Sequence, residues 1–349
     1  MSLENDSTIA AEQAKSNEAN KAPLPPVAPA LDPGYAQWVS SIFPADATPP
    51  PLGTIVEMRE STETMIRTLF AQFPPQPTVT QTSYTITSSD GAPIDVIRFT
   101  SPQTQDSDQG SQNRPAVLHF HGGGHCGNSV SMFERAISEL VVLTGVQIFS
   151  VEYRLAPEHP APAALEDGYA ALTWLSSNAA SLGVDASRIA IMGESSGGGL
   201  AAGIALLARD RGFSPGLKKM VLVYPMLDDR SITQNPAWDA DNRTVQFLTL
   251  CWEAYVGKEK AGDAAADVSC YAAPGRAESL KGLPGAYMEV GELDEFKDEC
   301  QRFAERLAGG GTNVEFHLWP GVPHGFDAAR EIGVTKRAIE GRVRVLREL

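Results

Sequence analysis

The chain has 349 residues, 42% of them hydrophobic, and a formal net charge of −15 at pH 7. A chain of this length can bury one large core, which we predict as a single domain with an insertion. The acidic balance excludes binding to a nucleic acid, because no local basic patch offsets the repulsion from a phosphate backbone.

Residues 1–30 are polar and then proline-rich, a composition typical of a disordered tail. They lack the apolar core of a signal peptide, and no later run resembles a membrane span. We therefore expect a cytoplasmic protein without a stable membrane anchor. The four cysteines lack metal-type spacing and are expected to be reduced thiols; they are Cys126, Cys251, Cys270 and Cys300.

Residues 31–75 contain apolar side chains at helical spacing, in two stretches separated by the sequence ATPPPLG. Tyr35 and Trp38 belong to the first stretch, and Met65 and Phe70 belong to the second. Such spacing predicts two amphipathic helices, each of which needs a partner surface for its apolar face. We interpret them as N-terminal cap helices.

Residues 76–349 show the alternation of strands and helices that is typical of an α/β domain. The segment TVTQTSYTITSSDGAPIDVIRF predicts two strands joined by a Ser-Asp-Gly turn. Short apolar runs then alternate with helical patterns, which favours a mostly parallel central sheet flanked by helices. The runs are AVLHF, VQIFSVEY, RIAIMG, KMVLVYPM, GAYMEVG and VEFHLW. The interval 228–273 is too long for an ordinary connection and contains several aromatic residues, so we predict an inserted helical cap.

The sequence GESSG lies between the predicted strand RIAIMG and the predicted helix LAAGIALLARDRG. A strand, a sharp turn and a helix form the setting of a nucleophile elbow, in which Gly193 and Gly197 leave room for the strained turn around Ser195. The N–H of Ser196 then lies at a helix N-terminus, where it can stabilise an oxyanion. The five-residue pattern alone also occurs by chance, so the prediction of a nucleophile elbow depends on its position between a strand and a helix.

The sequence HGGG, comprising His121, Gly122, Gly123 and Gly124, follows the predicted strand AVLHF. Consecutive glycines leave backbone N–H groups free to stabilise a developing alkoxide. A phosphate-binding loop is the alternative, but the glycines lack the Gly-x-Gly-x-x-Gly spacing and no lysine follows them.

A serine nucleophile needs a histidine as its base, and the chain has six histidines. His324 follows the last predicted strand and stands downstream of the serine, in the chain order that such hydrolases require. His125 lies beside the glycine loop and is a candidate pocket residue rather than the base. The others have structural interpretations; they are His119, His121, His159 and His317.

The acid that orients the histidine is ambiguous from the residues alone, because two strand ends offer carboxylates. Asp228 and Asp229 follow one predicted strand. Four more carboxylates follow another; they are Glu292, Asp294, Glu295 and Asp298. In the stretch YRLAPE, we interpret Arg154 and Glu158 as an ion pair that holds a loop.

The motifs together resemble the hormone-sensitive-lipase family of α/β-hydrolases, in its bacterial and fungal esterase branch. They span the chain from about residue 80 to its end, and are HGGG at 121–124, YRLAPEHPAPAALED at 153–167, GESSGG at 193–198, YPMLD at 224–228, GELDEFKDEC at 291–300 and GVPHGF at 321–326. The chain departs from the family where GESSGG replaces the frequent GDSAGG and DEFKDE replaces the frequent DPLRDE. Because of these departures, the substrate preference of the family is a weaker guide to that of this chain.

The resemblance implies an α/β-hydrolase fold, with Asp294 as the catalytic acid and Gly123, Gly124 and Ser196 as the oxyanion hole. It also implies a serine carboxylesterase that acts through an acyl-enzyme on short- to medium-chain or small-metabolite esters, without metal or cofactor. A homo-oligomer is compatible with it. The alternatives are a lactonase or amidase with the same triad and a non-catalytic ligand-binding receptor, against which the presence of His324 argues.

Overall fold

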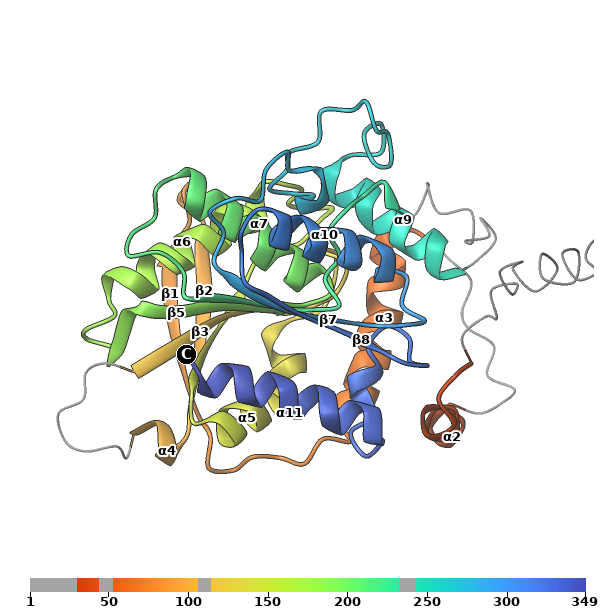
Figure 1. Ribbon diagram of the computed structural model, residues 1–349, viewed down its shortest axis with the longest axis horizontal. Helices are drawn as coiled ribbons and strands as arrows, with labels where there is room; N and C mark the ends of the chain where they lie inside the picture. The colour runs from red at the N-terminus through yellow and green to blue at the C-terminus, as the bar shows by residue number, and fades with distance from the viewer. Residues whose placement is uncertain (1–29, 44–52, 106–113, 232–242) are drawn as a thin grey trace, which may run out of the picture. The chain divides into compact units, whose positions relative to one another are not determined.

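The computed structural model describes residues 30–43, 53–105, 114–231 and 243–349. An eight-stranded sheet with the order β1-β2-β4-β3-β5-β6-β7-β8 lies at the centre of the unit Leu31–Leu349 (Figure 1). The strands are β1 (Thr80–Thr87), β2 (Pro93–Thr100), β3 (Arg114–Phe120), β4 (Gln147–Glu152), β5 (Val184–Glu194), β6 (Lys219–Val223), β7 (Gly285–Gly291) and β8 (Val314–Trp319).

The strands pair as their hydrophobic patterns predict. β1 and β2 form the expected antiparallel hairpin, and β2 is also antiparallel to β4. All pairings from β4 through β3 to β8 are parallel. The central strands are apolar almost throughout, because helices cover both faces of a parallel sheet. The prediction of an α/β-hydrolase fold with a mostly parallel sheet is confirmed.

Helices lie on both faces of the sheet. In Figure 1, α6, α7 and α10 lie on one face, and α5 and α11 lie on the other. The helices are α2 (Pro33–Ile42), α3 (Ile55–Phe70), α4 (Pro102–Gln105), α5 (Val130–Thr144), α6 (Ala163–Ser177), α7 (Ser196–Asp210), α9 (Arg243–Val256), α10 (Lys297–Gly309) and α11 (Gly333–Arg347), with the short 3₁₀ turns η1 (Pro274–Arg276) and η2 (Phe326–Ala328). Within the described ranges, none of these helices combines the length and the apolarity that a membrane crossing requires.

The helices α2, α3 and α9 pack beside the sheet and are not part of its two covering layers. Asp32 caps α2 by accepting a 2.9 Å hydrogen bond from the N–H of Tyr35. Thr54 and Glu57 form a capping box at the start of α3, so each satisfies an N–H that the helix itself leaves unpaired. α3 contacts both α5 and α9.

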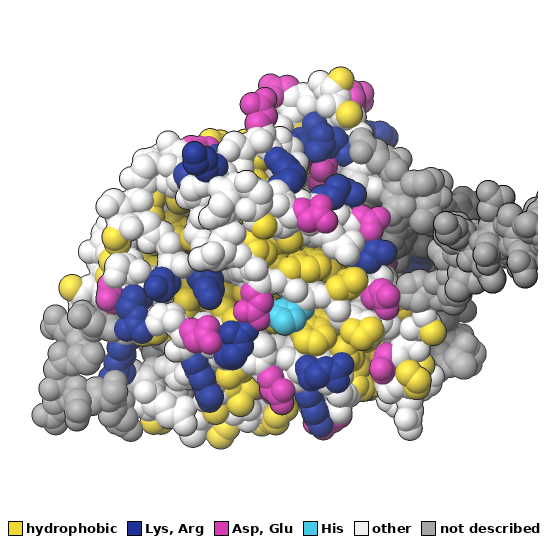
Figure 2. Space-filling view, in the orientation of Figure 1, with side chains coloured by type: hydrophobic (Ala, Val, Ile, Leu, Met, Phe, Trp, Pro, Cys, Tyr) yellow, Lys and Arg dark blue, Asp and Glu magenta, His cyan; other side chains and the backbone are white. Residues whose placement is uncertain are grey.

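The face seen in Figure 2 carries charged side chains of both signs, with hydrophobic side chains gathered between them (Figure 2). The edge strand β8 is only partly covered, and Leu318 in it is 38% exposed. Interspersed charges of this kind keep a surface hydrated without creating a single-sign field.

One sequence interpretation is wrong. Arg154 does not pair with Glu158; it binds Asp167 and Asp90, with 2.7 Å between the nitrogen and oxygen atoms in each pair. Glu158 instead pairs with Arg59 of α3. The expected tail falls almost entirely outside the described residues, as does residue range 232–242 of the expected insertion.

Candidate active site

Ser195 occupies a sharp turn between β5 and α7, at the carboxyl end of the central strands. Its φ is 56°, a left-handed backbone angle that is uncommon for a residue with a side chain. The turn is held on both sides, because the N–H of Ser195 donates to the Val223 carbonyl at 2.9 Å and the Ser195 carbonyl accepts from the N–H of Met226 at 2.9 Å. The strain therefore persists only because the neighbouring strand and loop fix the turn.

The glycines that flank Ser195 are required by close backbone approaches. A Cβ atom on Gly193 would lie 2.2 Å from the Gly197 carbonyl oxygen, and one on Gly197 would lie 2.1 Å from the Phe120 carbonyl oxygen. No side chain fits at either distance. The GESSG turn therefore has the geometry of a nucleophile elbow.

The HGGG loop lies next to this turn, and its carbonyl groups face into the protein. The Gly122 carbonyl accepts hydrogen bonds from Asn128 Nδ2 at 3.0 Å and from the His121 ring at 2.9 Å. The Gly123 carbonyl accepts from two backbone N–H groups at 3.0 Å. Among the described residues, no hydrogen bond occupies the backbone N–H of Gly123, Gly124 or Ser196. These three donors are free to bind an oxyanion.

His324 lies between Ser195 and Asp294. Its Nε2 is 2.9 Å from Ser195 Oγ, and its Nδ1 is 2.9 Å from Asp294 Oδ2. The second Asp294 oxygen, Oδ1, accepts a 2.8 Å hydrogen bond from the N–H of Phe296. The structure thus brings together the three residues that the sequence analysis proposed as nucleophile, base and acid.

The charges around His324 favour its protonated form. Burial lowers the pKa of the imidazole. The negative charge and hydrogen bond of Asp294 raise it, and the negative charges of Glu295 and Asp327 raise it further. The net result is a pKa above the ordinary value. Asp294 can therefore stabilise the imidazolium that forms when His324 takes a proton.

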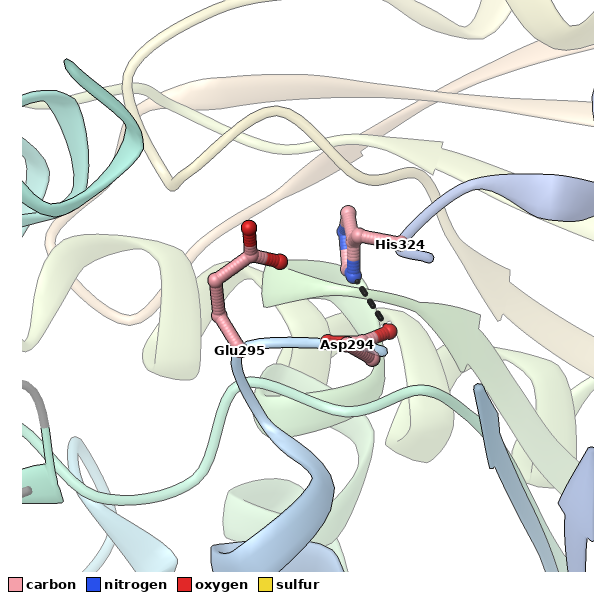
Figure 3. Close-up of side chains that lie close together, drawn as sticks. All are labelled: Asp294, Glu295 and His324. Atoms are coloured by element: carbon pink, nitrogen blue, oxygen red, sulfur yellow. Dashed lines mark hydrogen bonds and ion pairs between the residues drawn. The ribbon is translucent and has the colours of Figure 1, made fainter. Parts of the chain in front are cut away.

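Glu295 extends from the same loop as Asp294 and lies beside the His324 ring (Figure 3). One polar atom from each of the three residues lies within 4.8 Å of the others. A cluster of this kind could ligate a metal ion, but Asp294 and His324 bind each other directly. We therefore treat the cluster as part of the candidate active site.

A cavity of about 380 Å³ lies in front of Ser195. Its floor contains the glycine loop, Ser195 and His324, and its walls come largely from apolar side chains of α2, α3 and α9. The principal apolar side chains are Tyr35, Trp38, Met65, Leu69, Phe70, Phe247, Leu248 and Phe296. Such a volume and lining are typical of a small-molecule site.

His125, the candidate pocket residue of the sequence analysis, is absent from the cavity walls, and so is its neighbour Cys126. His125 is 1% exposed and stacks on Tyr255 with 3.9 Å between the ring centres, and burial lowers the pKa of His125 to about 3. Cys126 is 2% exposed, and its Sγ lies 3.8 Å from the Cys251 carbonyl oxygen. Both side chains fill space behind the glycine loop.

Sequence reasoning missed the side chains that hold the glycine loop from a distance. Arg59 of α3 donates to the Cys126 carbonyl at 2.5 Å and to the Ala156 carbonyl at 2.9 Å. Asn128 fixes Gly122, as described above. No sequence signal identifies Arg59, because its partners lie 67 and 97 residues further along the chain.

Similar proteins share the fold and the sequence of this region. A family model described as alpha/beta hydrolase fold matches residues 117–328, more than half of the chain. Esterase LipI of Mycobacterium tuberculosis is 38% identical over 216 residues, which cover 61% of this chain and 65% of the relative. Carboxylesterase NlhH of the same species is 38% identical over 218 residues, which cover 61% of this chain and 67% of the relative.

The solved structure of a bacterial heroin esterase aligns with a TM-score of 0.79 and 32% identity. The alignment covers 91% of this chain and 97% of that chain. The residues that the family model matches, 117–328, include the serine turn, the glycine loop and the histidine loop. The chain belongs to the hormone-sensitive-lipase family of α/β hydrolases, the family of these esterases.

Proposed function

We propose that this protein is a serine carboxylesterase that hydrolyses small carboxylic esters with short to medium acyl chains. The observation that most supports this proposal is the pair of 2.9 Å hydrogen bonds that link Ser195 through His324 to Asp294 beneath the cavity. The esterase names of the relatives support the same reaction class.

The first half of the reaction forms an acyl-enzyme. Ser195 Oγ attacks the ester carbonyl carbon while its proton passes to His324 Nε2. The carbonyl oxygen becomes an oxyanion, which the free N–H groups of Gly123, Gly124 and Ser196 stabilise. Collapse of this intermediate breaks the bond to the alcohol oxygen, which takes the proton from His324 as the alcohol departs.

The second half releases the acid. A water molecule gives a proton to His324 and attacks the acyl carbon, and the same N–H groups stabilise the second oxyanion. The bond to Ser195 Oγ then breaks, and the proton returns from His324 to the serine. Asp294 holds the imidazole ring in place through both halves, because its two oxygens are bound by the ring and by the N–H of Phe296.

The cavity supports a small substrate. A volume of about 380 Å³ accommodates an ester of modest size, and the apolar helices around it favour a hydrocarbon acyl chain over a charged one. A Cβ atom on Gly124 would lie 2.5 Å from the buried Cys251 Sγ, so this position of the glycine loop accepts only glycine.

The test is hydrolysis of p-nitrophenyl esters from acetate to palmitate by the wild-type protein and by Ser195→Ala. We expect a maximum at short or medium chains, and a loss of kcat in the variant on the order of 10⁴-fold or more. Ester hydrolysis that persists in Ser195→Ala would falsify the mechanism. Hydrolysis of lactones or amides without hydrolysis of open-chain esters would replace the proposed substrate class.

A matched control is Ser187→Ala. Ser187 lies on the same strand as the turn but is exposed, and its hydroxyl donates to Asp185 Oδ1 at 2.6 Å. This variant removes a serine hydroxyl without touching the cavity, so it should retain the wild-type rate.

A further inference from the structure

Among the residues that the structure describes, one acidic side chain in the cavity, that of Glu295, has no lysine or arginine paired with it. Three carboxylates line the cavity, and no lysine or arginine does, among the residues the structure describes. Glu194 is bound by His119 at 2.9 Å, and Asp327 is bound by Arg342 at 2.6 Å. Within the described ranges, Glu295 forms no ion pair and no side-chain hydrogen bond with another residue, and its carboxylate lies near the His324 ring. Its carboxylate therefore remains available to a ligand.

Two aromatic rings line the same cavity as Glu295. Tyr35 and Trp38 of α2 both line it, with 5.5 Å between their ring centres. The N–H of Asp32, at the start of α2, donates to the Gly321 carbonyl at 2.7 Å, which ties this helix to the loop that carries His324. Burial and the negative charges of Asp327 and Glu295 raise the pKa of Tyr35 to about 12, so Tyr35 lies within the field of Glu295.

A carboxylate beside aromatic faces is a combination that binds positively charged amines. The aromatic ring attracts a cation through its quadrupole, and Trp does so most strongly. The apolar walls exclude water, which strengthens the attraction to the carboxylate. The net charge of −15 also raises the concentration of cations near the molecule.

The position of Glu295 indicates which end of the ester would carry the cation. His324 gives its proton to the departing alcohol oxygen, so the alcohol part lies on the His324 side of Ser195. Glu295 lies beside the His324 ring, as Figure 3 shows, and the oxyanion donors come from the separate loop 121–124. A charged group on the alcohol can reach Glu295 more directly than one on the acyl chain.

We propose that Glu295, Tyr35 and Trp38 form a subsite for a positively charged amine in the alcohol part of the ester. The inference rests on the proposed esterase function and narrows its substrate class to esters of amino alcohols or of other amine-bearing alcohols. Esters whose alcohol carries a carboxylate or phosphate are disfavoured by the same charge.

The experiment compares two esters that differ only in charge. Butyrylcholine carries a quaternary ammonium, and 3,3-dimethylbutyl butyrate carries a carbon atom in its place. The quantity measured is the ratio of kcat/KM for the charged ester to that for the neutral ester. We expect Glu295→Gln to lower this ratio by about 10-fold and Trp38→Phe to lower it by a smaller factor.

The matched control is Asp298→Asn, which makes the same change of charge three residues further along. Asp298 does not line the cavity, and its side chain is 45% exposed. A ratio that falls in Glu295→Gln and not in Asp298→Asn supports the subsite. A ratio that is unchanged in Glu295→Gln, or that falls equally in both variants, overturns it.

The two proposals fail in different ways. If the wild-type protein does not hydrolyse the neutral ester, or if Ser195→Ala hydrolyses it as fast, the esterase function itself is wrong. If the neutral ester is hydrolysed with dependence on Ser195 and the ratio does not respond to Glu295, only the subsite is wrong.

Discussion

The cavity has two walls that are built in different ways. The strand-end wall comprises residues 122–124, 128, 194–195, 295–296 and 323–325, and the helical wall comprises side chains of α2, α3 and α9. Close backbone approaches fix the turns behind the first wall; a Cβ atom added at Gly197, for example, would lie 2.1 Å from the Phe120 carbonyl oxygen. Side chains such as Trp38 and Phe247 shape the second.

This difference matches what each wall has to do. Reacting atoms must be held within a fraction of an ångström, and a backbone locked by strands and tight turns provides that precision. Selection among substrates needs only a surface of suitable size, and packed side chains provide it. Changes in the backbone of the strand-end wall should therefore affect the rate of the chemical step, and changes in the side chains of the helical wall should affect the choice of substrate.

Apart from the loss of the nucleophile itself, the largest expected effect comes from adding one methyl group to the strand-end wall, in Gly123→Ala. Gly123 has a φ of 139°, and its Cβ would lie 2.2 Å from the Gly127 carbonyl oxygen. The loop must shift, and the N–H groups of Gly123 and Gly124 shift with it. We expect kcat for p-nitrophenyl butyrate to fall about 10²- to 10³-fold, the effect of losing an oxyanion donor.

The control for this prediction is Gly309→Ala, at the end of α10. No atom lies within 4 Å of a Cβ at Gly309, and its φ is ordinary, so this variant should keep both rate and stability. Circular dichroism and thermal unfolding show whether each variant is folded. A folded Gly123→Ala protein with less than a tenfold loss of kcat would contradict the role of this wall.

A smaller effect is expected from removing a whole ring from the helical wall, in Phe247→Ala. Phe247 lines the cavity near Gly124. Its loss enlarges the space for the acyl chain, so the ratio of kcat/KM for p-nitrophenyl octanoate to that for the acetate should rise about 10-fold. The rate on the better ester should remain within about tenfold of the wild type, because no reacting group moves.

Leu250→Ala is the matched control on the same helix. Leu250 is partly buried but does not line the cavity, so it should change stability without changing the chain-length preference. A Phe247→Ala protein whose kcat falls equally on all esters would show that the helical wall also positions the chemistry. The comparison between the walls would then be wrong.

The two walls also differ in how well the sequence predicts them. The strand-end wall follows from local patterns, because a buried parallel strand is apolar throughout and the glycine turns follow directly after such strands. Ser195 and His324 could be proposed from chain order and from these turns. Asp294 could not be distinguished from the neighbouring carboxylates without the family resemblance. The choice depends on a long-range contact, because the N–H of Leu293 donates to the Val322 carbonyl at 3.0 Å and so joins the Asp294 loop to the His324 loop.

The helical wall depends on contacts between distant segments, which no local pattern records. The amphipathic spacing predicted helices near Tyr35 and Met65, but it did not indicate that Arg59 would brace the glycine loop. The incorrect Arg154–Glu158 pair has the same cause, because both residues found partners far along the chain. The tail, the domain boundaries, the cytoplasmic location and the homo-oligomer stay predictions.

The smallest expected effect is a shift in the pH profile of kcat/KM. A change of charge in the strand-end wall should cause this shift, and a neutral change in the helical wall should not. His324 accepts the serine proton only when it is neutral, so kcat/KM for a neutral ester falls as the pH drops below the pKa of His324. Because the surrounding carboxylates raise this pKa, the acid limb should lie at a higher pH than for an ordinary imidazole. Glu295→Gln removes one of the negative charges that act on His324, the others being Asp294 and Asp327, so its acid limb should move to lower pH.

Phe247→Ala provides the comparison for this shift, because it alters the helical wall without altering any charge near His324. Its acid limb should coincide with that of the wild type, even though its chain-length preference changes. The measurement is kcat/KM for p-nitrophenyl butyrate across the acid range for all three proteins. An acid limb that stays in place in Glu295→Gln, or that moves equally in both variants, would mean that Glu295 does not act on His324 through its charge. The strand-end wall would then control the imidazole through Asp294 and backbone geometry, and Glu295 would belong functionally with the helical wall.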